Sequence, residues 1–256
     1  EERLRHQSLH DPLTGVANRA LFIDRLMQAL VRRRRQGGSV AVLFLDPDHF
    51  KLVNESLGHL AGDHLLRSVG QRLIDTVRAV DTVARFGGDE FAVLLEDAGS
   101  RNEVVGVAGR ILHAMAAPLV VDARPATLAA SLGVAFAQDG DSAETLMRNA
   151  DLAVYKAKSA GRGRVAVYEP DMQQAVGTRL ELHQALRRAL ARDEFALHYQ
   201  PLVALEDGAL IGVEALLRWS QDGQPLAPND IVAAAEEAGL IDALGRQVLA
   251  RALHDA

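Results

Sequence analysis

The chain has 256 residues, 48% of them hydrophobic and 24% charged, with a formal net charge of −6. This composition is typical of a globular protein with one large domain, or one domain and part of another. No apolar run in the sequence is long enough to span a bilayer. The negative net charge excludes a surface that is used mainly to bind nucleic acid. The sequence has no cysteine, which excludes disulfides, Cys-ligated zinc and thiol catalysis and fits a cytoplasmic domain.

The N-terminal part predicts a helix, a turn and a second helix. Residues 1–10 have a helical pattern that starts abruptly, as if a longer helix had been cut, and residues 11–15 contain the Pro and Gly of a turn. Asn18 can cap the next helix. The apolar positions of that helix recur at helical spacing: Leu21, Phe22, Leu26, Ala29 and Leu30.

Four consecutive arginines, Arg32–Arg35, precede Gly37 and Gly38. They could form an anion-binding patch. We expect instead the last turn of the helix, where cations are favoured and glycine ends the helix.

Residues 40–45 form a continuous apolar run of strand length, which predicts a central strand buried on both faces. The run ends in Asp46, Pro47 and Asp48. Carboxylates at the end of a buried strand are costly unless they are paired, and a divalent cation is one such partner.

Gly87 and Gly88 lie between two β-rich runs, residues 82–86 and 91–95, and predict a tight hairpin. The turn holds two acidic side chains, Asp89 and Glu90, at its tip. A solvated turn is the alternative interpretation of this stretch taken alone.

The remaining pattern predicts further helices and strands. Helices are expected at residues 62–78, 100–117 and 142–159, and strands at 119–121, 126–137 (paired as a second hairpin) and 164–168. The order β-α-β-β-α-β, with additions, predicts an α+β fold with a mostly antiparallel sheet covered by helices. A helix at 172–192, strands at 195–202 and 210–219 and two short helices complete the chain.

In this topology the end of the first strand and the tip of the hairpin become neighbours, and we expect their carboxylates to converge: Asp46, Asp48, Asp89 and Glu90. Oxygen ligands without cysteine indicate Mg²⁺ or Mn²⁺ rather than zinc. A chance cluster of acidic residues remains the alternative.

Residues 1–169 resemble the GGDEF domain of diguanylate cyclases through a series of blocks in the family's order. The blocks are Asp11-Pro-Leu-Thr14, Asn18-Arg19, Leu45-Asp-Pro-Asp-His-Phe-Lys51, Asn54, Gly58-His59, Gly62-Asp63, Arg78-Ala-Val-Asp81, Gly87-Gly-Asp-Glu-Phe91, Tyr155-Lys-Ala-Lys158 and Gly161-Arg162. The resemblance implies an α+β domain with a βαββαβ core of the nucleotidyl-cyclase or polymerase-palm type. The implied reaction condenses two GTP molecules, one on each subunit of a homodimer, into cyclic di-GMP with release of pyrophosphate.

The resemblance also implies roles for individual positions. Asp46, the Pro47 carbonyl and Asp89 match metal ligands, and Glu90 matches a residue that binds a second ion or helps to deprotonate the attacking hydroxyl. The positions that match substrate contacts are Asn54 and Asp63 for guanine, and Phe50, Lys51, Lys158 and Arg162 for the triphosphate. Taken one at a time, each of these side chains could instead be a solvent-exposed or helix-capping residue that binds no ligand.

Arg78 and Asp81 match the family's site for inhibition by the product, cyclic di-GMP; a helix-end ion pair of little energetic value is the alternative. An upstream sensor domain, through which the full-length protein could associate with a membrane, is the further expectation. Pro47 departs from the family pattern because an aliphatic residue is usual there, and Glu55 and Gly163 replace the usual Asp and Asn.

Residues 193–256 resemble the beginning of an EAL phosphodiesterase domain through Tyr199-Gln-Pro201 and Glu214-Ala-Leu-Leu-Arg-Trp219. Gln200, Glu214 and Arg218 match metal- or ligand-contacting positions. The family's (β/α) barrel takes roughly 250 residues, so we expect only its truncated start, joined by a linker helix at 170–192, and no phosphodiesterase activity from this chain. The alternative function is a weakly active GTP- or cyclic di-GMP-binding module that regulates an EAL phosphodiesterase.

Overall fold

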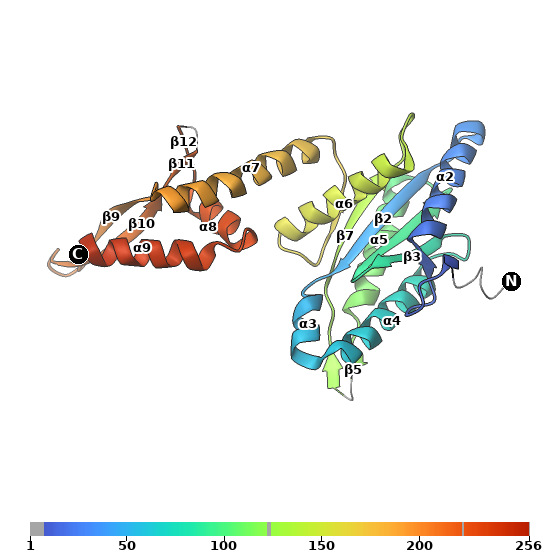
Figure 1. The fold of residues 1–256 in the computed structure, drawn as a ribbon, viewed down its shortest axis with the longest axis horizontal. Helices are drawn as coiled ribbons and strands as arrows, with labels where there is room; N and C mark the ends of the chain where they lie inside the picture. Colours follow the sequence, from blue (N-terminus) through green and yellow to red (C-terminus); the bar gives the residue numbers. More distant parts are fainter. Residues whose placement is uncertain (1–7, 122–123, 222, 256) are drawn as a thin grey trace. The chain divides into compact units, whose positions relative to one another are not determined.

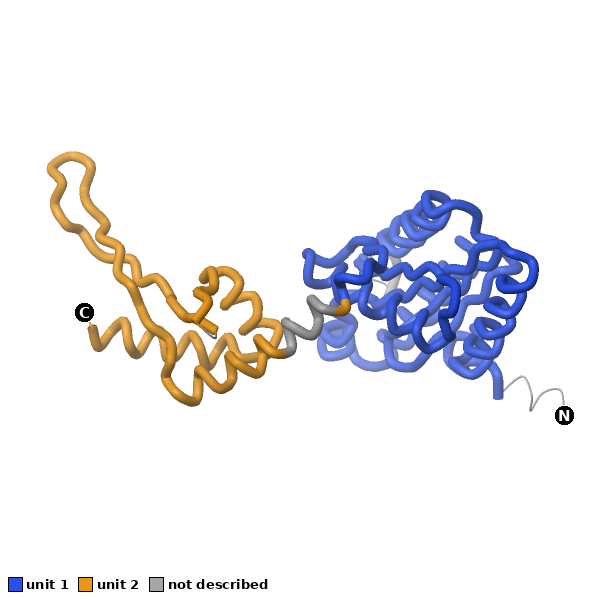
Figure 2. The backbone as a smooth tube through the Cα atoms, turned by 90° about the horizontal axis from the view of Figure 1, so that it is seen from above, with its two compact units in different colours: residues 1–172 blue, residues 173–256 orange. Residues whose placement is uncertain are grey.

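The computed structural model describes residues 8–121, 124–221 and 223–255, and its contacts divide the chain into two units, residues 1–172 and residues 173–256 (Figure 2). Helix α7 (Asp171–Arg192) crosses from one unit to the other.

A six-stranded sheet in the order β1-β3-β4-β2-β7-β8 forms the centre of the first unit (Figure 1). Its strands are β1 (Ala17–Asn18), β2 (Val40–Pro47), β3 (Thr82–Gly87), β4 (Glu90–Glu96), β7 (Ala130–Phe136) and β8 (Val165–Val167). The inner pairings β3–β4, β4–β2 and β2–β7 are antiparallel, whereas β1 and β8 join in parallel. The predicted α+β class is confirmed, and the sheet is mixed.

Helices cover both faces of this sheet. On one face lie α3 (Phe50–Leu57), α4 (His59–Thr76) and α5 (Arg101–Ala116), and on the other α2 (Arg19–Gln36) and α6 (Ala143–Ser159). Strand β2 is central, as predicted: Leu43 and Leu45 enter the first core, and Val42 and Phe44 the second. This double burial explains why the strand reads as an unbroken apolar run.

Two predicted helix starts are confirmed by their hydrogen bonds. Asn18 caps α2 by accepting from the Leu21 amide, and Ser100 with Glu103 forms a capping box on α5. The arginine run lies at the C-terminal end of α2, and its members contact acidic or carbonyl partners: Arg32 with Glu96, Arg33 with Asp139 at 2.9 Å, and Arg34 with the Asp141 carbonyl at 3.0 Å.

Residues 119–121 do begin a hairpin, but the predicted second strand at 126–137 is wrong. Strand β5 (Leu119–Val121) pairs with β6 (Arg124–Ala126) in a small separate sheet, and β7 begins only at Ala130 and joins the main sheet. No turn residue marks the break, so the composition looks like one strand. Helix α3 was not predicted, and of the predicted helix at 1–10 residues 1–7 lie outside the described residues.

The second unit packs α7 and a hairpin against two helices. Its elements after α7 are β9 (Ala196–Val203), β10 (Leu210–Arg218), β11 (Ser220–Gln221), β12 (Gln224–Pro225), α8 (Pro228–Glu237) and α9 (Ile241–Asp255). Leu186, Phe195, Trp219 and Ile231 are members of its core. Among the helices that the structure describes, none has the length and apolarity needed to span a bilayer.

We predict that Gly133→Ala pushes α6 off the sheet. A Cβ at this position of β7 would overlap the backbone of α6 at Ala150, Ala153 and Val154, and a helix backbone cannot yield as a side-chain tip can. The expected loss is about 3 kcal/mol in the free energy of unfolding, measured by urea denaturation followed by circular dichroism.

Gly109→Ala in α5 is the matched control, because nothing lies within 4 Å of its added Cβ. It should be neutral or stabilising by up to about 1 kcal/mol through helix propensity. Equal stability of the two variants would contradict the close approach of α6 to β7.

Candidate active site

The pairing of β2 with β4 brings the two predicted acidic elements together. Leu45 lies opposite Phe91 in this antiparallel register, so the next residue of β2, Asp46, lies at the same end of the sheet as Glu90. Asp89 precedes Glu90 in the β3–β4 turn. In keeping with this register, repulsion from Asp89 raises the pKa of Asp46, and repulsion from Asp46 raises the pKa of Glu90.

The turn that presents Asp89 and Glu90 depends on two glycines. Gly87 has φ +130° and Gly88 φ +53°, and Gly87 pairs with Glu90 across the turn. Positive φ is the region that glycine adopts without a steric cost, so the predicted tight hairpin is confirmed.

Arg85 holds the β3–β4 turn by hydrogen bonds to its backbone. Its guanidinium donates to the Gly88 carbonyl at 3.0 and 2.7 Å and to both oxygens of Asp11 at 3.1 Å. Asp11 also accepts from the amide and hydroxyl of Thr14 at 2.9 and 2.6 Å. The N-terminal turn thus holds the hairpin in place through one largely buried ion pair.

Two carboxylates at this edge of the sheet, Asp46 and Glu90, have raised pKa values. Burial raises the pKa of Asp46, with further increases from Asp89 and Asp48, against the lowering effect of Lys158. Burial also raises the pKa of Glu90, as does repulsion from Asp151, Asp46 and Asp89. Clustered acidic groups whose pKa values rise together are typical of functional sites.

Asp151 of α6 is an acidic residue of the site that was not predicted from the sequence. It lines a cavity of about 700 Å³ together with Glu90, Phe44, Phe86 and Met147. The signal was its spacing, since Asp151 lies seven residues before Lys158 and both therefore face the same side of α6.

Lys158 supplies a positive charge beside Asp46, and its Nζ lies 2.5 Å from Asp46 Oδ2. Among the described residues, no three Asp, Glu or His side chains are arranged as a ready-made cation site. The donor set nevertheless fits magnesium, which is usually bound by one or two carboxylates and completed by phosphate oxygens and water.

Asp48 acts on the charge of Asp46, but its own side chain is hydrogen-bonded to other parts of the first unit. It is 6% exposed, and its oxygens accept from the Ser131 hydroxyl at 2.8 Å and from the Gly163 amide at 3.0 Å. Each carboxylate oxygen of Asp48 therefore already accepts one hydrogen bond from the protein.

The residues predicted to contact guanine and the phosphates lie on the neighbouring helices. Asn54 of α3 packs against Gly62 of α4, where any side chain would overlap the Asn54 amide oxygen, and Asp63 is the next residue of α4. Phe50 is buried in the core, whereas Lys51 is exposed and lies 3.7 Å from Glu55.

Arg162 lies in the loop after α6, four residues beyond Lys158, and adopts the left-handed region at φ +58°. Its side chain is exposed.

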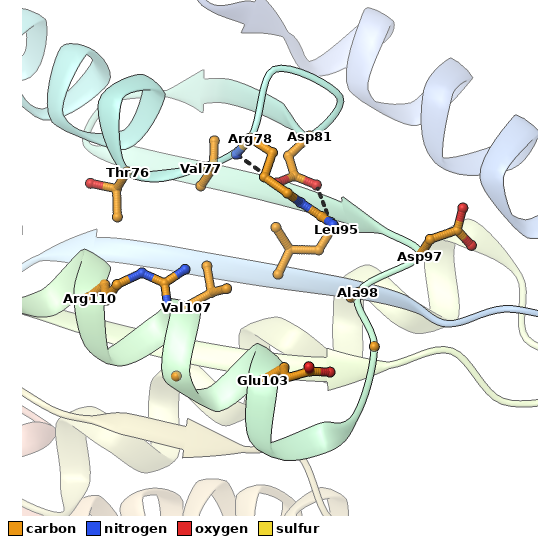
Figure 3. A pocket seen from close by; sticks show the side chains of 12 residues that line it. Thr76, Val77, Arg78, Asp81, Leu95, Asp97, Ala98, Glu103, Val107 and Arg110 are labelled. Atoms are coloured by element: carbon orange, nitrogen blue, oxygen red, sulfur yellow. Dashed lines mark hydrogen bonds and ion pairs between the residues drawn. The ribbon is translucent and has the colours of Figure 1, made fainter.

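Arg78 and Asp81 line a cavity of about 390 Å³ between the end of α4 and α5 (Figure 3). The Arg78 guanidinium donates to Asp81 at 3.2 and 3.0 Å and to the Glu96 carbonyl at 2.8 Å. The ion pair that was the alternative interpretation of these two residues is therefore present. Arg110 lines the same cavity, on the α5 face that it shares with Glu103 and Val107. Arg110 was not predicted as a site residue, although its helical spacing from Glu103 places both on one face of α5.

In the second unit Gln200 and Glu214 are direct cross-strand partners of the β9–β10 hairpin. Arg218 lies four residues further along β10 and therefore on the same face as Glu214.

Comparison with known proteins gives two family matches. Residues 8–164 match the family model described as "Diguanylate cyclase, GGDEF domain", and residues 183–256 match the EAL domain model. The chain is 42% identical, over its whole length, to an uncharacterised signalling protein of Caulobacter vibrioides. It is 41% identical, over 94% of its length, to the bifunctional diguanylate cyclase/cyclic di-GMP phosphodiesterase MucR of Pseudomonas aeruginosa.

The chain spans about a third of these relatives, 32% and 36% of their lengths. Among solved structures it is similar to the GGDEF domain of TpbB from Pseudomonas aeruginosa, with a TM-score of 0.64 and 37% identity over 66% of this chain and 99% of that one. The structure of the coiled coil and GGDEF domain of DgcB from Caulobacter crescentus, solved in complex with c-di-GMP, has a TM-score of 0.61 and 29% identity over 65% of this chain and 88% of that one.

We predict that Asp11→Asn destabilises the first unit in a pH-dependent way. Burial raises the pKa of Asp11, but hydrogen bonds from Thr14 and Arg85 outweigh it and hold that pKa below its ordinary 3.8. The ionised carboxylate thus stabilises the fold fully above pH 3.8, and this contribution disappears as the pH falls through the lowered folded-state pKa.

Urea unfolding at neutral pH should therefore show a loss of about 1.5 kcal/mol in Asp11→Asn. The difference from the unaltered protein should shrink below pH 3.8. A difference that stays constant into that acid range would show that the ionised state of Asp11 contributes nothing.

Proposed function

The chain belongs to the GGDEF family of diguanylate cyclases and continues into an EAL domain, and on this premise we propose that it condenses two GTP molecules into cyclic di-GMP. In this reaction the 3′-hydroxyl of each GTP attacks the α-phosphorus of the other. Two phosphodiester bonds form, two pyrophosphates leave, and each hydroxyl gives up its proton. The observation that carries the proposal is the β2–β4 register, which sets Asp46 beside the Asp89–Glu90 turn.

Asp46, the Pro47 carbonyl and Asp89 would hold Mg²⁺ or Mn²⁺ in this account. The bound cation would neutralise charge on the triphosphate and orient the leaving group. Glu90 would accept the hydroxyl proton or contribute to a second cation site. Its raised pKa supports the first role, because a better base accepts a proton more readily.

Substrate would be held by residues of three helices and a loop. Asn54 and Asp63 would read the guanine edge, since an amide with a carboxylate complements its donors and acceptors. Gly62 supports this pairing because it lets Asn54 lie close against α4. The triphosphate would be wrapped by the Phe50–Lys51 segment and contacted by Lys158 and Arg162.

One GGDEF domain would hold half of the reaction, so we propose that the active species is a homodimer. We assign residues 1–169 to the cyclase domain, 170–192 to a linker helix and 193–256 to the start of the EAL domain. Gln200, Glu214 and Arg218 would belong to the phosphodiesterase site of the longer protein. An upstream sensor segment would control pairing of the cyclase domains.

The deciding experiment is incubation with GTP and Mg²⁺ followed by chromatography of the products. We expect cyclic di-GMP and pyrophosphate, and a rate lowered roughly 10²-fold or more in Asp89→Asn, which keeps the size of the side chain but removes its charge. The rate per protomer should fall on dilution because two sites must meet. A verified dimer that makes no cyclic di-GMP would refute the proposal, and a rate strictly linear in protein at high dilution would refute the dimer.

A regulatory GTP-binding module is the second candidate, and Pro47 favours it. Proline fixes φ and lacks an N–H at the end of β2, beside the proposed ligands. One relative, 40% identical over 98% of this chain, is the cyclic di-GMP phosphodiesterase NbdA of Pseudomonas aeruginosa. Tight binding of GTP without turnover would select this candidate.

We further propose that Arg78 and Asp81 bind the product and inhibit the cyclase, with Arg110 as a second cation in the same cavity. Arg78→Ala should raise the cyclic di-GMP concentration for half-inhibition about tenfold or more, because a charged hydrogen-bond donor is lost. Arg67→Ala is the control, since Arg67 is an exposed arginine of α4 outside this cavity. Unchanged inhibition in Arg78→Ala would contradict the assignment.

A further inference from the structure

Asp48 is a buried carboxylate that the proposed chemistry does not use. It is 6% exposed, and within the described parts of the chain it forms no ion pair with a Lys, Arg or His. Its charge is instead stabilised by the Ser131 hydroxyl at 2.8 Å and the Gly163 amide at 3.0 Å. A buried carboxylate with two hydrogen bonds and no counter-ion is costly for the fold.

The Gly163 amide belongs to the loop that carries Arg162. Arg162 and Gly163 both adopt the left-handed region, at φ +58° and +60°, and Arg162 is not a glycine. Such a conformation persists only where the surroundings enforce it. Two contacts do so here: the Arg162 amide donates to the Ala157 carbonyl at 3.1 Å, and the next amide donates to Asp48.

Asp48 is in turn fixed to the sheet. Its own amide donates to the Ala129 carbonyl at 2.9 Å, and Ser131 lies in β7 with 0% exposure. In the β2–β7 register Ser131 is the partner of Asp46. Asp46 therefore lies at the end of β2, and Asp48, two residues later, accepts the hydrogen bond from the Gly163 amide in the Arg162 loop.

We propose that Asp48 is a positioning residue, which ties the loop of Arg162 to the strand end of Asp46 and so sets the Arg162 guanidinium for the distal phosphates of GTP. This inference rests on the proposed function, in which Arg162 contacts those phosphates. Asp48 itself touches neither the nucleotide nor the cation.

The negative charge of Asp48 could act differently, through the field at Asp46. The variant Asp48→Asn separates the two effects. Its amide oxygen can accept from Gly163 while its NH₂ group donates to the Ser131 hydroxyl, so both contacts survive without the charge. Asp48→Ala removes both contacts, and Asp48→Ser, which keeps a partner for Ser131 but is too short to reach both groups, replaces it if Asp48→Ala does not fold.

The first measurement tests the hydrogen bond from the Gly163 amide to Asp48 and does not depend on catalysis. In the full chain labelled with ¹⁵N-glycine, the 21 glycine amides give a simple NMR spectrum, and loss of one peak in Gly163→Ala assigns Gly163. We expect its hydrogen exchange to quicken about tenfold or more in Asp48→Ala, as for loss of a charge-assisted hydrogen bond, and to stay slow in Asp48→Asn.

The second measurement is a double-mutant cycle on the binding of 3′-deoxy-GTP with Mg²⁺, because this nucleotide lacks the attacking hydroxyl and is not consumed. Asp48→Ala and Arg162→Ala should each weaken binding about tenfold, and the double variant should bind no more weakly than Arg162→Ala alone. Asp48→Asn should restore binding to within a few-fold of the unaltered protein.

Each other outcome overturns the inference in a distinguishable way. If Arg162→Ala weakens binding but Asp48→Ala does not, or if their effects simply add, Asp48 does not act through Arg162. If Asp48→Asn keeps the slow exchange but binds as weakly as Asp48→Ala, charge rather than position matters. If neither single variant changes binding, the phosphate contact assigned to Arg162 in the proposed function is itself wrong.

Discussion

The antiparallel register between β2 and β4 is the constraint on which the rest of the site depends. With Leu45 opposite Phe91, the end of the central strand and the tip of the β3–β4 hairpin must meet at one edge of the sheet. A shift by one residue would turn every side chain of β2 to the opposite face, and because both faces are buried in well-packed cores, such a shift is strongly opposed. The core thus enforces a cluster of like charges that would not form by itself. Lys158 offsets part of the repulsion at Asp46, and a cation bound with phosphate oxygens would offset the remainder.

Contacts to backbone atoms position the segments that carry the proposed site residues at this edge of the sheet. Arg85 grips the Gly88 carbonyl beneath the acidic turn, and Asp48 grips the Gly163 amide beneath the Arg162 loop. Gly133 brings α6, and with it Lys158, close against the sheet. The Gly88 contact of Arg85 lies within its own hairpin, whereas the contacts of Asp48 and Gly133 join segments that are far apart in the sequence to the central sheet. Preorganisation of this kind suits phosphoryl transfer, in which catalysis consists mainly of positioning and charge stabilisation.

The sequence predicted the features that rest on local chemistry or on an unbroken pattern. The central strand followed from its apolar run, the hairpin from Gly87 and Gly88, and the helix starts from their capping residues. It failed where tertiary contacts decide. No turn residue precedes β7, so the sequence does not show where this strand begins. Asp48 was expected to converge with the other acidic residues, and only the fold shows that Ser131 and Gly163 each bond to one of its oxygens. The family blocks predicted which side chains to examine, whereas their partners required the structure.

The most direct test of the central claim is the position of a divalent ion in crystals grown with Mn²⁺ and a non-consumable GTP analogue. Anomalous scattering locates manganese independently of the model of the protein. The account predicts an ion about 2.1 Å from carboxylate oxygens of both Asp46 and Asp89, bridged to the phosphates of the nucleotide. Manganese found elsewhere, or Asp46 still paired with Lys158 while the nucleotide lies away from the β2 end, would contradict it.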